Sequence, residues 1–141
     1  MSKLLQRLSD ASKSGVYRAS RSDQILDACR GSGLGIHRVQ LEGVAGRDAL
    51  MDRFAGALAL PGWFGRNWDA LEDCLCDLSW TAADGHVLLI EGSGGLPADE
   101  RGILLEVLGA AAAYWAGRGR SFFAVLVDGP PELRALYREG P

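Results

Sequence analysis

Two nearly continuous apolar runs constrain the fold of this chain more than any other feature of its sequence. "HVLLIEG" covers residues 86–92, and "SFFAVLVDG" covers residues 121–129. Each run has the length of a strand. Apolar and polar residues do not alternate along it, as they do in a strand with one face in water, and such a continuous apolar run is typical of a strand covered on both faces. We therefore predict two buried strands, with residues 86–92 in the centre of a sheet.

Segments with helical periodicity alternate with segments of strand length along the rest of the chain. Leu50, Phe54 and Leu58, for example, recur at helical spacing. That helix should end before Pro61, because the residue preceding a proline is pushed out of the helical region. We predict strands over residues 15–20 and 36–43, helices over 22–29, 46–58, 67–78 and 97–117, and a short terminal helix over 131–138. Strands alternating with helices favour parallel pairing, so the predicted fold is a small α/β sandwich.

The length of 141 residues fits one domain with a core of its own. Three glycines between residues 31 and 35 mark the one plausible internal boundary. We expect residues 1–35 to be an N-terminal extension, able to add a strand and a helix to the sheet edge, and residues 36–141 to be the compact remainder.

Charge and hydropathy exclude several classes of partner. The net charge of −3 and the pI near 5.3 argue against binding to nucleic acid, whose phosphates require a basic surface. The longest apolar stretch, Val107–Ala116, is too short to span a membrane, and no signal-peptide pattern opens the chain. We expect a cytoplasmic protein with no membrane partner.

The sequence offers little for catalysis or metal binding. His37 and His86 each begin a predicted strand, where a solvated or capped role is usual, and no Ser-His, Cys-His or HExxH pattern includes them. Cys74 and Cys76 point roughly 200° apart on a helix, so neither a disulfide nor a zinc knuckle is expected. We predict reduced, buried thiols, no catalytic residues, no cofactor and no metal. The chain is not expected to be an enzyme.

"GSGG", residues 92–95, stands between a predicted strand and a helix, where a phosphate cradle can form. It lacks both the GxGxxG spacing and the Lys-Ser/Thr pair of a P-loop. Turn glycines are the favoured interpretation, and a nucleotide-binding domain using Gly92–Gly95 is the alternative.

"PGWFGRNWDALEDCL", residues 61–75, brings Asp69, Glu72 and Asp73 together on one helix with no Lys or Arg among them. If Asn67 caps the helix, its side chain accepts from the amide of Asp69 or Ala70. The apolar residues recur at spacings of three and four and form a buried stripe: Trp68, Leu71, Leu75 and Leu78, with Cys74 beside them. The opposite face carries Asp69, Glu72, Asp73 and Cys76.

Two interpretations of this acidic face are open. One is a tolerated solvated surface, although i,i+4 pairs such as Asp69 and Asp73 cost a few tenths of a kcal/mol each. The other is a surface for a cationic, concave partner. Trp63 and Phe64 stand between glycines in the preceding loop, and aromatics beside uncompensated charge are typical of protein-binding hot spots.

The segment from Leu60 to Leu75 resembles the signature "LPxYYGxNxDALxDCL" of the barstar-like ribonuclease inhibitors. Weaker similarity extends from the strand at Ile36 to the strand ending at Val127. The resemblance implies a three-stranded parallel sheet packed on helices, and an inhibitor that plugs a ribonuclease active site with the loop and helix. By position, Asp73 would mimic a substrate phosphate and Asp69 would meet a further cation. Trp63, Phe64, Gly65 and Asn67 would form the surface beside them, and Glu72 and Cys76 complete the predicted site.

The chain departs from the family pattern at several of these positions. Trp63 and Phe64 replace residues that are usually Tyr, so they offer no hydroxyl groups. Cys76 and Leu78 stand where the best-known member has Thr and Trp. The acid near the end of that member's last long helix falls around residues 114–115, where this chain has no carboxylate. These differences favour a target other than the familiar guanyl-specific enzymes.

The sequence therefore predicts an inhibitor or immunity protein, monomeric when free, that binds a basic extracellular-type ribonuclease or a toxin nuclease domain in a 1:1 complex. The alternative is a non-inhibitory binding module of the same fold that recognises another basic protein.

Overall fold

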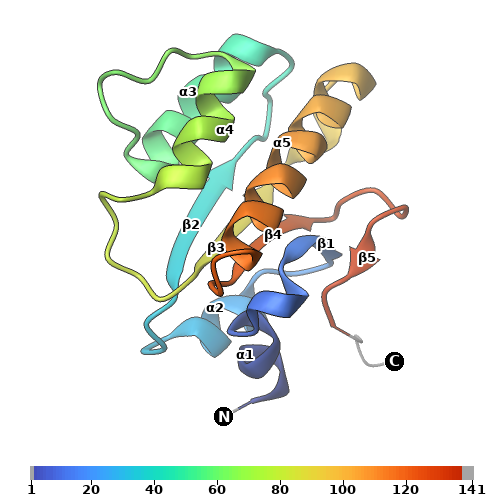
Figure 1. Cartoon of the computed structure of the whole chain (residues 1–141). Coiled ribbons are helices and arrows are strands. Elements are labelled where there is room, and N and C mark those ends of the chain that lie inside the picture. Colours follow the sequence, from blue (N-terminus) through green and yellow to red (C-terminus); the bar gives the residue numbers. More distant parts are fainter. Residues whose placement is uncertain (1, 138–141) are drawn as a thin grey trace.

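The computed structural model describes residues 2–137 and shows a parallel five-stranded sheet between two layers of helices (Figure 1). The strand order is β2-β3-β4-β1-β5, and every pairing is parallel. In chain order the strands are β1 (Gly15–Ala19), β2 (Gly35–Gln40), β3 (His86–Glu91), β4 (Phe122–Val127) and β5 (Arg134–Ala135). The predicted α/β class with a parallel sheet is confirmed.

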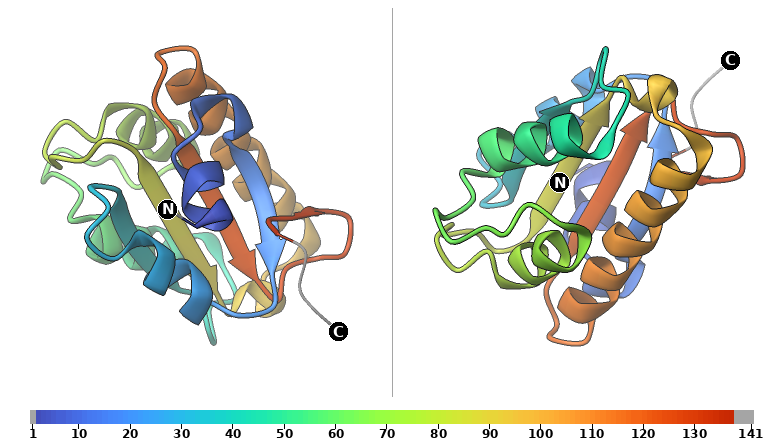
Figure 2. Two further views of the ribbon diagram at one scale, coloured as in Figure 1. Left: turned by 90° about the horizontal axis from the view of Figure 1, so that it is seen from below. Right: turned by 90° about the horizontal axis from the view of Figure 1, so that it is seen from above.

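Helices cover both faces of this sheet. They are α1 (Lys3–Leu8), α2 (Asp23–Cys29), α3 (Arg47–Leu58), α4 (Trp68–Asp77) and α5 (Ala98–Ala116), with 3₁₀ turns η1 (Ala11–Lys13) and η2 (Ser93–Gly95). Figure 2 shows α1 and α2, in blue, over one face, and α3, α4 and α5, in green and orange, over the other. Four of the helices match predicted ones within two residues at each end, but α1 was not predicted, because six residues show too little periodicity.

The two apolar runs form neighbouring interior strands. In β3, Leu88 and Ile90 pack under α3, α4 and α5, whereas Val87 and Leu89 face the other layer. Residues 87–90 are completely buried, as are the first five residues of β4. Burial on both faces explains why neither run alternates with polar residues.

The N-terminal segment completes the second face of the sheet. β1 pairs with β4, in the register Tyr17 with Val125, and so extends the sheet beyond the three strands β2, β3 and β4. Leu8 of α1 and Ile25 of α2 are fully buried in the cluster that covers this face.

The predicted terminal helix over 131–138 is wrong for residues 131–137, and Arg138 lies outside the described residues. The chain instead turns at Pro130 and forms β5 beside β1. The amide of Leu136 donates to the carbonyl of Arg18 at 2.9 Å, and the Arg18 guanidinium donates to the carbonyl of Leu133 at 2.8 Å. A distant strand therefore decides this conformation, not local periodicity.

The expected solvated or capped role for the histidines is wrong for His86, which is only 2% exposed. Its ring lies 5.4 Å from that of Trp115 and 5.6 Å from that of His37. Position in an interior strand, under the end of α5, accounts for its burial.

None of the helices within the described part of the chain has both the length and the apolar character needed to cross a membrane.

Candidate functional site

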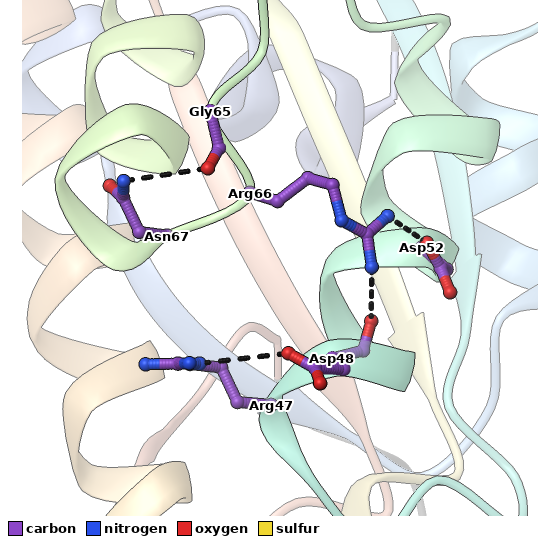
Figure 3. Close-up of polar contacts among 6 residues, drawn as sticks. All are labelled: Arg47, Asp48, Asp52, Gly65, Arg66 and Asn67. Carbon is purple, nitrogen blue, oxygen red and sulfur yellow. Dashed lines mark hydrogen bonds and ion pairs between the residues drawn. The ribbon is translucent and has the colours of Figure 1, made fainter.

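Helix α4 is fixed at its start by the predicted cap. The side chain of Asn67 accepts from the amide of Ala70 at 2.8 Å, and its own amide lies 3.5 Å from the carbonyl of Gly65 (Figure 3). On the inner face, Leu71 and Leu75 are fully buried in the core. A cap and a buried stripe together set the rotation of α4, and so decide which face it presents to solvent.

The end of α4 is locked to α5. Leu78 closes the helix in the left-handed region, with φ at 47°, and its amide donates to the carbonyl of Cys74 at 3.1 Å. The indole of Trp115 donates to the carbonyl of Leu75 at 2.8 Å. This bond satisfies a helix-terminal carbonyl that has no partner within α4, so it holds α4 against α5.

The outer face of α4 carries Asp69, Glu72 and Asp73, which we call the acidic face. Asp69 and Asp73 are exposed and Glu72 is half-buried. Within residues 2–137, none of the three makes an ion pair or accepts a side-chain hydrogen bond. The acidic face is therefore free to meet cations from outside the molecule.

The loop Gly62–Asn67, which we call the aromatic loop, presents one ring and buries the other. Trp63 is 64% exposed, more than any other large apolar side chain of the described residues. Phe64 is half-buried and packs against the core, and its amide donates to the carbonyl of Pro61 at 2.9 Å. The indole of Trp63 therefore leaves a large apolar area in contact with water.

Arg66 ties the aromatic loop to α3. It has a positive φ of 57°, and its guanidinium forms an ion pair with Asp52 and lies 3.5 Å from the carbonyl of Asp48 (Figure 3). The hydrogen bond from Arg66 holds the pKa of the Asp52 carboxyl below its ordinary value. This contact was not predicted from the sequence, because its two residues are 14 positions apart in the chain.

Arg118 is a second cation close to α4, and its position was not predicted from the sequence. Burial raises the pKa of the Cys76 thiol, Glu72 and Asp73 raise it further, and Arg118 lowers it. The guanidinium of Arg118 lies over the ring of Tyr114, with 3.8 Å to the ring centre. Thus the end of α5, which lacks a carboxylate here, brings a positive charge beside α4.

The three cysteines are free thiols in this structure. Cys29 and Cys74 are buried, as predicted, whereas the predicted burial is wrong for Cys76, which is half-buried at the border of the acidic face. Among residues 2–137, no three His, Cys, Asp or Glu side chains are arranged to hold a metal ion.

The "GSGG" segment forms the turn η2, and an acidic pocket lies beside it. Gly92 has a φ of 77°, and a Cβ there would lie 2.6 Å from the amide nitrogen of Glu42, so this position requires glycine. The pocket, of about 360 Å³, is lined by Glu42, Glu91 and Asp128 among others. Glu91 forms an ion pair with Arg38 at 2.8 Å, but Glu42 and Asp128 pair with no cation of the described residues. Their negative charge opposes a phosphate, which speaks against the nucleotide-binding alternative.

The fold and the site together define a small α/β protein that presents an acidic helix and an exposed aromatic loop. The family model of barstar (barnase inhibitor) matches residues 34–127, about two thirds of the chain, and the chain belongs to this family. The matched region contains β2, β3, β4, the aromatic loop and α4. No curated protein matches the chain significantly.

Proposed function

We propose that this chain is a cytoplasmic inhibitor of a ribonuclease, of the immunity or antitoxin type. It binds a basic extracellular-type ribonuclease or toxin nuclease domain in a 1:1 complex, and it covers the active site with α4 and the aromatic loop. Membership of the barstar (barnase inhibitor) family supports this class of function.

The observation that carries the proposal is the unpaired acidic face beside an exposed ring. Asp69 and Asp73 lie one helical turn apart and repel each other in the free protein. A ribonuclease that works without a metal ion holds the phosphate group of RNA with cationic side chains, and those cations offer the charge that the acidic face lacks. In the complex Asp73 takes the place of a substrate phosphate, and Asp69 and Glu72 meet neighbouring cations.

The remaining contacts follow from the shape of the loop. Trp63 supplies the apolar anchor, while Phe64 and Asn67 hold the loop and the start of α4 in place. Gly65 is exposed and has no side chain, so it leaves room for the partner beside the Trp63 ring. Cys76 lies at the edge of the proposed binding surface.

The experiment is an inhibition titration against a panel of small secreted ribonucleases, with RNA cleavage as the readout. For an inhibited enzyme, Asp73→Asn should weaken binding by at least about tenfold, since a hydrogen bond to a charged group contributes roughly 1.5–3 kcal/mol. Glu42→Gln is the matched control, because it also removes one exposed carboxylate but lies beside the acidic pocket. Equal losses for both variants would contradict the proposed site.

A second candidate is a non-inhibitory binding module that recognises another basic protein. It is favoured by Trp63 and Phe64, which lack the hydroxyl groups usual in the family, and by the cation Arg118 beside α4. If no ribonuclease of the panel is inhibited while a basic protein is retained on the immobilised chain, this candidate replaces the first.

A further inference from the structure

A row of stacked side chains lies on the sheet face that α1 and α2 cover. The ring of Tyr17 in β1 stacks on that of Phe123 in β4, with 5.5 Å between ring centres and 21° between planes. On the β5 side, Arg134 pairs in register with Tyr17, and its guanidinium carbon is 4.7 Å from the ring centre. Tyr17 and Arg134 both lie outside residues 34–127, which the family model matches.

A second guanidinium reaches the same ring from α1. The guanidinium carbon of Arg7 lies 5.3 Å from the centre of the Tyr17 ring. Its Nε is buried and has no hydrogen-bond partner. The two cations are at most about 10 Å apart, the Debye length at 0.1 M ionic strength, so they repel each other in the free protein.

Neither Arg7 nor Arg134 forms an ion pair with a carboxylate of residues 2–137. The charge of Arg7 contributes to lowering the pKa of Asp10, the carboxylate nearest to it in the chain. Asp10, however, accepts hydrogen bonds from the amide of Ser12 at 2.9 Å and from its hydroxyl at 2.6 Å, and these are the larger causes of that lowering. A further cation, Lys13, follows in η1, and its backbone carbonyl accepts from the hydroxyl of Tyr17.

Contact with an aromatic ring does not use up the hydrogen-bonding capacity of a guanidinium. A cation–π contact engages the flat face of the group, whereas its five N–H donors lie in the plane and point outward. Tyr17 is 1% exposed and fixed by Phe123, so it provides a rigid support for both groups. The N–H groups of the two guanidiniums are thus available to donate hydrogen bonds to a group with several acceptor oxygens.

We propose that Arg7 and Arg134, held over the ring of Tyr17, form a binding site for a phosphate-type oxyanion. Two guanidiniums match the geometry of phosphate oxygens, which accept pairs of parallel hydrogen bonds. A phosphate group carries a charge of about −1.5 to −2 at pH 7, enough to neutralise both cations, whereas a carboxylate neutralises one. This site is on the sheet face opposite to α3, α4 and α5, so it is independent of the proposed inhibitor surface.

The test is an NMR titration of the full ¹⁵N-labelled chain with inorganic phosphate, at constant ionic strength maintained with chloride. The Nε–H signals of Arg7 and Arg134 should shift and saturate. Arg134→Gln, a change at an exposed position, should weaken phosphate binding by about tenfold, the loss of one charge-assisted pair. Arg101→Gln is the matched control on α5, across the sheet, and should bind phosphate like the parent chain.

Arg7→Gln provides a second variant, and thermal unfolding shows whether each variant retains the fold. A parallel titration with a nucleoside 5′-monophosphate and with the bare nucleoside distinguishes free phosphate from the phosphate of a larger molecule. Tighter binding of the monophosphate than of inorganic phosphate identifies the larger source, and the reverse identifies the free ion. Shifts that never saturate, or equal weakening by Arg101→Gln and Arg134→Gln, would overturn the proposal.

Discussion

The guanidinium of Arg66 in the aromatic loop is paired with the carboxylate of Asp52 on α3, and this ion pair joins the proposed binding surface to the body of the protein. Both side chains are largely exposed, so the pair should add little to global stability. Its effect should be local, because it holds a non-glycine residue at a positive φ of 57°.

We therefore predict that Asp52→Asn leaves the thermal midpoint nearly unchanged and speeds hydrogen exchange at the amides of residues 62–67. Asp48→Asn is the control, since Arg66 approaches the backbone carbonyl of Asp48, which that substitution keeps. Unchanged exchange in the Asp52 variant would show that the loop is held by other contacts, such as the packing of Phe64.

Alanine substitutions of Trp63 and Phe64 should differ in their effects: the first should mainly weaken binding, and the second should mainly lower the stability of the fold. Trp63→Ala removes a ring that is 64% exposed, so it should change the unfolding free energy by less than about 0.5 kcal/mol. Phe64→Ala removes a half-buried ring that packs on the core, and should destabilise by roughly 1–2 kcal/mol. In an inhibition or pull-down assay, however, the Trp63 variant should lose at least as much affinity as the Phe64 variant. The opposite ranking would mean that Trp63 does not touch the partner.

The parts of the fold that could be predicted are those decided by local sequence. Residues 87–90 are apolar without interruption because neighbouring strands and two helix layers surround them, and that pattern is visible in the sequence itself. The cap at Asn67 and the buried stripe of α4 are likewise local, so the acidic face could be placed before the structure was known.

The parts that could not be predicted depend on distant partners. β5 is two residues long and exists because β1 offers a free edge, which no periodicity near residue 134 reveals. Arg66 finds Asp52, and Arg118 comes close to Cys76, only after α3, α4 and α5 have packed. The positions of the cations near the acidic face could therefore not be predicted from the sequence, although these cations influence what the face can bind.

The burial of His86 should make stability depend on pH. Burial, together with the positive charges of His37 and Arg120, lowers its pKa to about 4, while Trp115 covers the ring. The unfolded chain binds a proton below about pH 6.5, whereas the native chain does not until about pH 4, so stability falls as the pH drops between these values. The loss should be roughly 3 kcal/mol, because each pKa unit corresponds to about 1.4 kcal/mol, and it should be constant below that window.

Chemical denaturation at a series of pH values measures this loss. His86→Gln should be less stable at pH 7 but show a flatter dependence between pH 6.5 and pH 4. Burial also lowers the pKa of His37, so a smaller slope should remain in that variant and disappear when both histidines are replaced. If the unfolding free energy of His86→Gln changes with pH as steeply as that of the parent chain, the pH dependence arises from carboxylates instead.

The two indole hydrogen bonds should differ in their effect on α4. Trp115→Phe removes the donor to the carbonyl of Leu75 at a buried site, and should cost about 1–3 kcal/mol because it leaves that carbonyl without its partner. Trp80→Phe removes a similar bond to the carbonyl of Leu58, at 2.9 Å, where the indole is only partly buried. Water can replace the donor there, so the loss should be smaller. Only Trp115→Phe should also speed hydrogen exchange in the last turn of α4, and equal effects of both variants on that turn would show that Trp115 does not anchor it.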